Sequence, residues 1–164
     1  MAGHLSGKNI AVTGAGNGIG RAVAILCAEE GANVVVADYG VELDGSAPSS
    51  AVADEVVNQI KELGGNAIAV AGDVSESEVG QRIVETAIEA WGRIDGVACA
   101  AGILRERMLF NMTDEEFDDV VRVHLRGHFN VYRAASAVMR KQEGGGSILG
   151  FTSGAFVAST AQPN

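Results

Sequence analysis

Apolar positions along the chain follow two alternating patterns. Short continuous apolar runs predict buried strands, at residues 10–12, 33–37, 67–71, 94–98 and 147–152. Apolar residues spaced three or four positions apart predict helices between them, at about residues 19–30, 51–63, 75–91 and 113–141. Strands that alternate with helices are typical of βαβ units, whose crossovers are right-handed. The pattern therefore predicts an α/β fold with a doubly wound, Rossmann-type parallel sheet, strand order 3-2-1-4-5, and helices on both faces.

Polar residues at the helix starts support these boundaries. Ser75 with Glu78, and Thr113 with Glu116, have the spacing of a capping box, in which side chains and backbone amides bond reciprocally. No further helical pattern follows the last strand. We therefore expect that strand at the edge of the sheet with a partly bare face.

An apolar stripe runs along the last and longest helical pattern and includes Phe117, Leu125 and Phe129. Such a stripe fits a subunit interface, and the alternative is that it covers the sheet. A homotetramer or homodimer is the expected assembly.

The composition changes this picture little. With 164 residues, 47% hydrophobic content and two prolines, the chain fits a single domain over residues 1–164. A net charge of -9 without a basic cluster argues against nucleic acid as a partner. The sequence has no signal core and no run of eighteen apolar residues, which argues against a membrane partner and favours the cytoplasm. Cys27 and Cys99 lie among apolar residues and are predicted to be reduced core side chains.

The turn from Thr13 to Gly20 holds four glycines between the first strand and the first helix. Its backbone can approach a phosphate closely, and the positive end of the helix dipole faces the anion. A P-loop is excluded because Gly20 is followed by Arg21 and not by lysine. The pattern G-x-G-x-x-G also fails, since its third glycine would fall on Ile19 or Arg21. The motif that residues 13–20 do match is T-G-x-x-x-G-x-G. The alternative to a phosphate site is an ordinary tight turn.

Three further positions follow strand ends at the same edge of the sheet, where doubly wound folds bind ligands. Asp38 could accept both hydroxyls of an adenosine ribose and repel a 2′-phosphate, which favours NAD over NADP; a solvated carboxylate is the alternative. Asp73 and Val74 could meet the adenine edge, although Asp73 could instead reinforce a helix start. Gly102 leaves room for the nicotinamide ribose, although small residues there could also serve close packing.

These residues together resemble the short-chain dehydrogenase/reductase family. Residues 13–20 match its glycine motif, Asp38 its NAD-selecting acid, and residues 73–74 its adenine-contact pair. Residues 99–102 stand where the family has Asn-Asn-Ala-Gly, and residues 148–153 where its serine-bearing strand lies. The predicted NAD-binding residues are Gly14, Asn17, Gly18, Ile19, Gly20, Asp38, Asp73, Val74, Ala100, Ala101 and Gly102.

Within this family, residues 102–107 and 123–129 resemble the (3R)-hydroxyacyl-CoA dehydrogenase domain of peroxisomal multifunctional enzymes. The resemblance implies hydride transfer between NAD and a secondary alcohol, which would be a 3-hydroxyacyl thioester or a similar hydrophobic small molecule. Two other functions stay open. One is a catalytically incomplete NAD-binding module with a sensing or assembly role, and the other is a doubly wound methyltransferase.

The resemblance also assigns catalytic roles. Family members use a tyrosine as general acid/base, and Ser153 matches the serine that hydrogen-bonds the substrate oxygen. His124 occupies the position of the proton-relay asparagine, where it could take over the relay or simply be a packed or solvated histidine. His124 and His128 have no apparent third ligand, so no metal site is expected. The family's Tyr-x-x-x-Lys would begin just beyond Asn164, and we expect the N-terminal part of a longer enzyme, without the family's C-terminal strands and helices.

Overall fold

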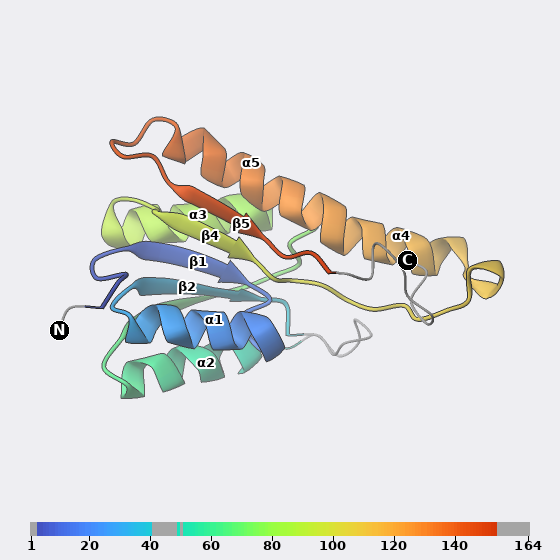
Figure 1. The fold of residues 1–164 in the computed structure, drawn as a ribbon, viewed down its shortest axis with the longest axis horizontal. Coiled ribbons are helices and arrows are strands. Elements are labelled where there is room, and N and C mark those ends of the chain that lie inside the picture. The colour runs from blue at the N-terminus through green and yellow to red at the C-terminus, as the bar shows by residue number, and fades with distance from the viewer. Residues whose placement is uncertain (1–2, 41–48, 50, 154–164) are drawn as a thin grey trace.

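Five parallel strands form one sheet in the computed structural model, which describes residues 3–40, 49 and 51–153 (Figure 1). The strands are β1 (Asn9–Thr13), β2 (Asn33–Asp38), β3 (Asn66–Ala71), β4 (Gly96–Cys99) and β5 (Ser147–Gly150). Their order is β3-β2-β1-β4-β5, so the predicted doubly wound fold is confirmed. β4 begins two residues later than predicted, and β5 ends two residues earlier.

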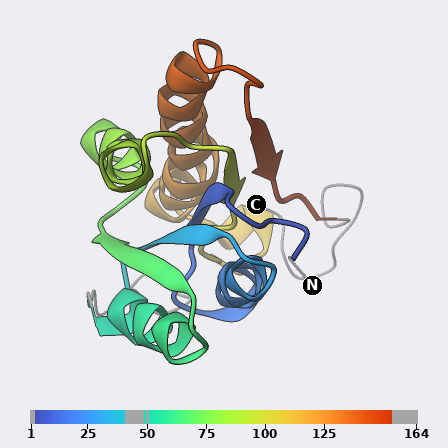
Figure 2. The same cartoon turned by 90° about the vertical axis from the view of Figure 1, so that its left-hand side faces the viewer.

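Helices cover both faces of the sheet (Figure 2). One face carries α1 (Gly18–Glu29) and α2 (Ala51–Glu62), and the other carries α3 (Ser77–Trp91) and α5 (Gly127–Met139). Successive residues of β2 point to opposite faces: Val34 and Val36 pack toward α1 and α2, while Val35 and Ala37 pack toward α3 and α5. Because both faces are buried, this strand is a continuous apolar run.

The helix α1 rests on the sheet through small residues. Its buried residues are Gly20, Ala24 and Ala28, whereas Ile19 is 67% and Leu26 57% exposed. Among its larger apolar residues, Val23 and Cys27 are partly buried against the core, whereas Ile19 and Leu26 lie off the buried face. Small side chains allow the helix axis to approach the strands closely, which brings the amino end of α1 near the glycine turn.

The two predicted capping boxes have different outcomes. Thr113 caps α4 (Asp114–Val121) reciprocally with Glu116, as predicted. The box of Ser75 and Glu78 is wrong, because α3 begins only at Ser77 and no side chain caps it.

The long helix is continuous but not uniform. A π-helical segment (Arg122–Arg126) joins α4 to α5, and a short 3-10 helix (Leu109–Asn111) precedes them. Phe117, Leu125 and Phe129 in the apolar stripe are each at least half exposed. Ala135, farther along the same stripe, is buried in the core that covers this face of the sheet. β5 lies at the sheet edge with all four residues exposed, which confirms the expected bare face.

Three asparagines stand in register at the amino end of the sheet, where β1, β2 and β3 begin. Asn66 Nδ2 donates to Asn33 Oδ1 at 3.1 Å, and Asn33 Nδ2 donates to Asn9 Oδ1 at 2.8 Å. Asn9 Nδ2 then donates to the carbonyl of Arg93 at 3.1 Å. This amide ladder ties three strands and the α3–β4 connection together.

None of the described helices is long and apolar enough to cross a lipid bilayer.

Candidate functional site

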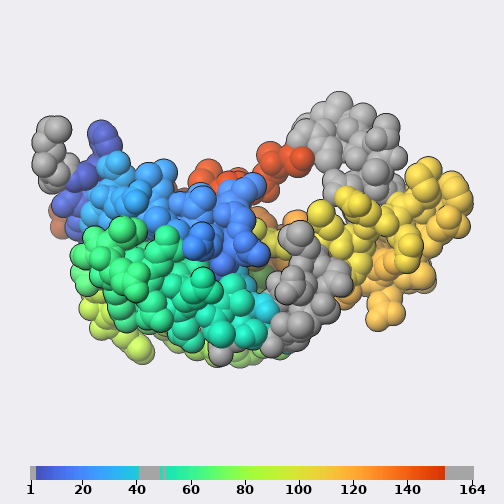
Figure 3. Space-filling model, turned by 90° about the horizontal axis from the view of Figure 1, so that it is seen from below, coloured from blue at the N-terminus to red at the C-terminus, as the bar shows by residue number. Residues whose placement is uncertain are grey.

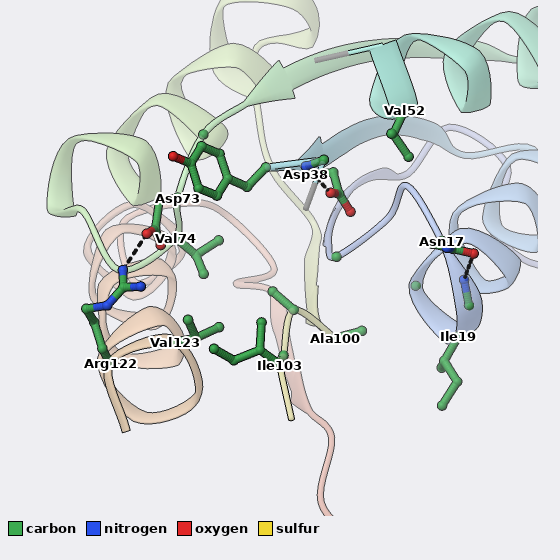
Figure 4. Close-up of a pocket in the computed structure, with 18 of the residues that line it drawn as sticks. Asn17, Ile19, Asp38, Val52, Asp73, Val74, Ala100, Ile103, Arg122 and Val123 are labelled. Atoms are coloured by element: carbon green, nitrogen blue, oxygen red, sulfur yellow. Dashed lines mark hydrogen bonds and ion pairs between the residues drawn. The ribbon is translucent and has the colours of Figure 1, made fainter. Parts of the chain in front are cut away.

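A cavity of about 550 Å³ lies at the carboxyl edge of the sheet. Its walls come from the ends of β1 to β4, from α4 and from the π-helical segment (Figure 4). Seen from outside, the molecule is hollowed between α1, in blue, and the segment after β4, in yellow (Figure 3). Every residue predicted to bind the cofactor lines this cavity. The structure thus brings together residues from four strand ends, while their contact with a cofactor stays a prediction.

The glycine turn is shaped by two close backbone approaches. Gly14 has φ of 64°, and a Cβ there would lie 2.7 Å from backbone atoms of Ala101. A Cβ at Gly20 would lie 2.1 Å from the carbonyl oxygen of Gly14. Gly18 is different, because it has φ of 51° but nothing within 4 Å of its missing Cβ. Backbone packing therefore leaves no room for a side chain at Gly14 or Gly20, whereas the turn is open toward the cavity at Gly18.

The amino end of α1 supplies hydrogen-bond donors at the cavity. Asn17 is the N-cap, and its side-chain oxygen accepts from the Gly18 amide at 2.8 Å. The Arg21 amide donates to the Asn17 carbonyl at 3.1 Å, whereas the amides of Ile19 and Gly20 precede the first bond of the helix and carry the positive end of its dipole. This open cradle fits the diphosphate of a dinucleotide.

Asp38 is held in place by backbone amides on both sides. Its Oδ2 accepts from the Gly16 amide at 2.7 Å, and its Oδ1 accepts from the Gly40 amide at 2.6 Å. The carboxylate therefore does not move freely in solvent. It places a fixed negative charge between the glycine turn and the end of β2.

Asp73 is fixed as well, but by a different set of groups. Its Oδ1 accepts from the Ser75 amide at 2.8 Å, and its Oδ2 forms an ion pair with Arg122. Burial alone would raise the pKa of Asp73, but hydrogen bonds from Ser75 and Arg122 outweigh burial and lower it. Asp73 thus fixes the turn before α3 and does not cap the helix itself, and it lines the cavity.

Thr13 joins the glycine turn to the segment after β4. Its hydroxyl accepts from the Ala101 amide at 3.3 Å, and its carbonyl accepts from the Ala100 amide at 3.2 Å. Cys99 lies beside it in the core, where burial raises the pKa of the thiol to about 12. Cys99 is thus a reduced core residue as predicted, while Cys27 is only partly buried.

His124 packs directly against Gly102. A Cβ at Gly102 would lie 2.5 Å from His124 Cε1, so a side chain there would displace the imidazole. The Nε2 atom lies 3.2 Å from the amide nitrogen and 2.9 Å from the carbonyl oxygen of Ile103. The space predicted for a nicotinamide ribose at Gly102 is therefore occupied by the His124 ring on the Cβ side. The His124 ring contacts the cavity wall at Ile103, but the residue is exposed, and its proton-relay role stays a prediction.

Ser153 follows β5, is exposed and does not line the cavity. The structure therefore does not bring it together with the cofactor-site residues, and its catalytic role stays a prediction. Within the described residues, no three His, Cys, Asp or Glu side chains gather as metal ligands would.

Arg122 and Arg105 also line the cavity, and the sequence analysis did not single them out. Arg122 pairs with Asp73, which is 49 residues away in the chain, so only the folded structure shows the contact. No local spacing signal could have identified it.

A family model described as short chain dehydrogenase matches residues 8–162. The chain belongs to the short-chain dehydrogenase family. Its relatives include the hydroxyacyl-CoA dehydrogenase ChsB1 of Mycobacterium tuberculosis, 46% identical over 89% of this chain and 45% of that protein. Another is the peroxisomal multifunctional enzyme type 2 of Mus musculus, 42% identical over 98% of this chain and 22% of that protein.

A solved short chain dehydrogenase from Mycobacterium avium has the same fold. It superposes with a TM-score of 0.85 at 43% identity, covering 93% of this chain and 56% of that one. The chain thus spans about half the length of the Mycobacterium relatives and about a fifth of the multifunctional enzyme from Mus musculus. The predicted resemblance to the family and to its hydroxyacyl-CoA dehydrogenases is confirmed.

Proposed function

We propose that this chain forms the cofactor-binding part of an NAD-dependent oxidoreductase that interconverts a hydrophobic secondary alcohol and its ketone. The family implies a nicotinamide cofactor, and the glycine cradle at the amino end of α1 fits its diphosphate. The observation that carries the choice of NAD is the fixed Asp38 carboxylate. A 2′-phosphate beside it would meet a like charge that two amides hold in place.

The bound nicotinamide would accept or give the hydride. The chain's own residues would bind and orient it: the open backbone at Gly18 and the Ile19 amide would face the diphosphate. Asp38 would accept from the adenosine ribose, and Asp73 and Val74 would border the adenine. His124 keeps the wall at Gly102 and Ile103 in position. Ser153 would donate a hydrogen bond to the substrate oxygen.

The proposed substrate is a 3-hydroxyacyl thioester. This proposal rests on two relatives, one named a hydroxyacyl-CoA dehydrogenase and the other a peroxisomal multifunctional enzyme. Both match almost all of this chain at above 40% identity. The cytoplasm is the proposed compartment, although peroxisomal relatives make the peroxisome the alternative.

A homodimer or homotetramer is the proposed assembly. Phe117, Leu125 and Phe129 expose a large apolar surface along α4 and α5, and burial of such a surface is favourable. Light scattering of the native polypeptide that carries this sequence tests the assembly. A monomer at micromolar concentration would contradict it.

Cofactor choice is tested by calorimetric titration with NAD and with NADP. We expect NAD to bind at least about tenfold more tightly, equivalent to about 1.4 kcal/mol. Asp38→Ser should reduce this ratio, whereas Asp54→Ser, on the exposed face of α2, should leave it unchanged. Equal affinities in the wild-type protein would contradict the choice of NAD.

Activity is tested by NADH formation from a panel of 3-hydroxyacyl-CoA thioesters with the native polypeptide. Turnover supports the oxidoreductase. NAD binding without turnover of any alcohol in the panel would favour the non-catalytic sensing or assembly module instead.

A further inference from the structure

Four charged side chains form a continuous chain along one wall of the cavity. Arg105 Nη2 lies 2.9 Å from Asp119 Oδ2, and Asp119 Oδ1 lies 3.6 Å from Arg122 Nη2. Arg122 Nη1 then pairs with Asp73 and donates to the hydroxyl of Ser75 at 2.7 Å. All four charged residues line the cavity, so the chain of ion pairs is part of its surface.

This chain of ion pairs joins two parts of the site that the sheet keeps apart. Asp73 follows β3 and Arg105 follows β4, and β2 and β1 lie between these strands. At about 4.8 Å per strand, the two strands are separated by roughly 14 Å. The link passes instead through α4 and the π-helical segment, which carry Asp119 and Arg122.

Each end of the chain touches a different part of the proposed cofactor site. Asp73 and Val74 border the adenine end, and a buried Asn130 fixes the same turn through the carbonyls of Val74 and Ser75, at 3.0 and 2.9 Å. Arg105 belongs to the segment that begins at Gly102 and Ile103, where His124 packs.

The middle of the chain of ion pairs is partly exposed, which limits what it contributes to stability. The side chains of Arg122 and Asp119 are 45% and 30% exposed, whereas that of Asp73 is 15% exposed. Exposed pairs add little to the free energy of unfolding, but a bidentate or networked arginine fixes the direction of the carboxylates that it holds.

From this arrangement we infer that Arg105, Asp119 and Arg122 act as a positioning relay, which couples occupation of the adenine end of the cavity to the order of residues 103–108. The inference rests on the proposed cofactor site. A ligand that contacts Asp73 and Val74 restrains Asp73, and Arg122 and Asp119 pass that restraint to Arg105. Arg105 borders the side of the cavity where the reaction would take place.

The relay is tested with ADP, which carries the adenine but no nicotinamide. Hydrogen–deuterium exchange is measured over residues 103–108 with and without ADP. In the wild-type protein, ADP should slow exchange in this segment. Asp119→Asn should abolish that protection while keeping ADP affinity within about twofold, because it leaves the Asp73–Arg122 pair intact. Arg122→Gln should abolish the protection and also weaken ADP binding by about tenfold, as expected for loss of a charged hydrogen-bond partner.

A matched control is Glu116→Gln. This variant removes the pair between Glu116 of α4 and Arg107, which lies within residues 103–108. Neither residue lines the cavity, so the variant breaks a contact of the probed segment without touching the chain of ion pairs. It should leave both ADP affinity and the protection unchanged, and thermal unfolding verifies that each variant is folded. ADP protection that survives Asp119→Asn, or that is missing from the ADP-bound wild-type protein, overturns the relay alone. Failure of the wild-type protein to bind either ADP or NAD overturns the proposed function and the relay with it.

Discussion

The two edges of the same sheet use polar side chains in opposite ways. At the amino edge, Asn9, Asn33 and Asn66 bond to one another, so their amides are satisfied within the protein. At the carboxyl edge, Asp38 and Asp73 are also held by hydrogen bonds, yet they border a cavity of about 550 Å³. Polar groups that satisfy one another support the sheet. Polar groups that are fixed beside an open space are prepared to bind a ligand.

The largest effect is expected at the carboxyl edge, from Gly14→Ala. Its positive φ and its 2.7 Å approach to Ala101 leave no room for a methyl group. We expect a loss of about 3 kcal/mol in the free energy of unfolding and loss of NAD binding, measured by urea unfolding and calorimetry.

Gly18→Ala is the matched control for this variant. Gly18 also has positive φ but no atom within 4 Å of its missing Cβ, so we expect a loss of only about 1 kcal/mol. Equal stability of the Gly14 and Gly18 variants would show that the close approach to Ala101 does not shape the turn.

At the amino edge, Asn33→Ala should cost stability without affecting the cofactor. It removes two hydrogen bonds, one to Oδ1 of the buried Asn9 and one from Nδ2 of the exposed Asn66. We expect a loss of about 1–3 kcal/mol in urea unfolding and unchanged NAD affinity. Asn66→Ala removes only one bond from an exposed residue and should cost less than about 1 kcal/mol. A change in NAD affinity on either substitution would contradict the view that the two edges of the sheet have separate roles.

Falling pH should lower the free energy of unfolding through His128, which lies near the carboxyl edge of the sheet. Burial lowers the pKa of this histidine below its ordinary value of about 6.5, and its ring lies near Gly150 at the end of β5. Between these two pKa values the unfolded chain binds a proton that the folded protein does not bind. The stabilising contribution is therefore present above about pH 6.5 and is lost as pH falls through the lower pKa of the folded protein.

His128→Gln should flatten this dependence, measured by urea unfolding at pH values from about 7.5 to 5. Asp73 does not interfere, because the window of a carboxyl with a lowered pKa lies below about pH 4. His4→Gln, at an exposed position, is the control and should keep the wild-type slope. If the free energy of unfolding of the His128 variant changes with pH as steeply as that of the wild-type protein, this histidine is not the source of the pH dependence.

The smallest effect is expected from Lys8→Ala at the amino edge. Lys8 Nζ lies 3.5 Å from Asp95 Oδ1, but its side chain is 54% exposed, and Arg93 pairs with the same oxygen at 3.0 Å. We expect a change below about 0.5 kcal/mol in urea unfolding. A loss as large as that of Asn33→Ala would mean that ion pairs, and not the amide ladder, hold this edge together.

Local patterns predicted the sheet well because strand order follows from short connections and right-handed crossovers. The position of Asp38 and the spacing of the glycines also predicted the edge of the sheet at which the cavity lies. The spacing of apolar residues predicted α1 but did not identify its buried face, because Gly20, Ala24 and Ala28 bury little apolar area and give a weak periodic signal. The relay through Arg122 could not be predicted, since it depends on where a distant helix crosses the end of β3.

The π-helical segment between α4 and α5 sets the rotational phase of one helix relative to the other. Each residue of an α-helix turns the chain by about 100°, so one residue more or fewer between the two helices changes the direction of every side chain beyond it. Deleting one residue from 122–126 would therefore turn Asp119 away from its partners while α5 stays packed on the sheet. Among related proteins, the positions equivalent to residues 122–126 should therefore tolerate substitutions better than insertions or deletions of a single residue.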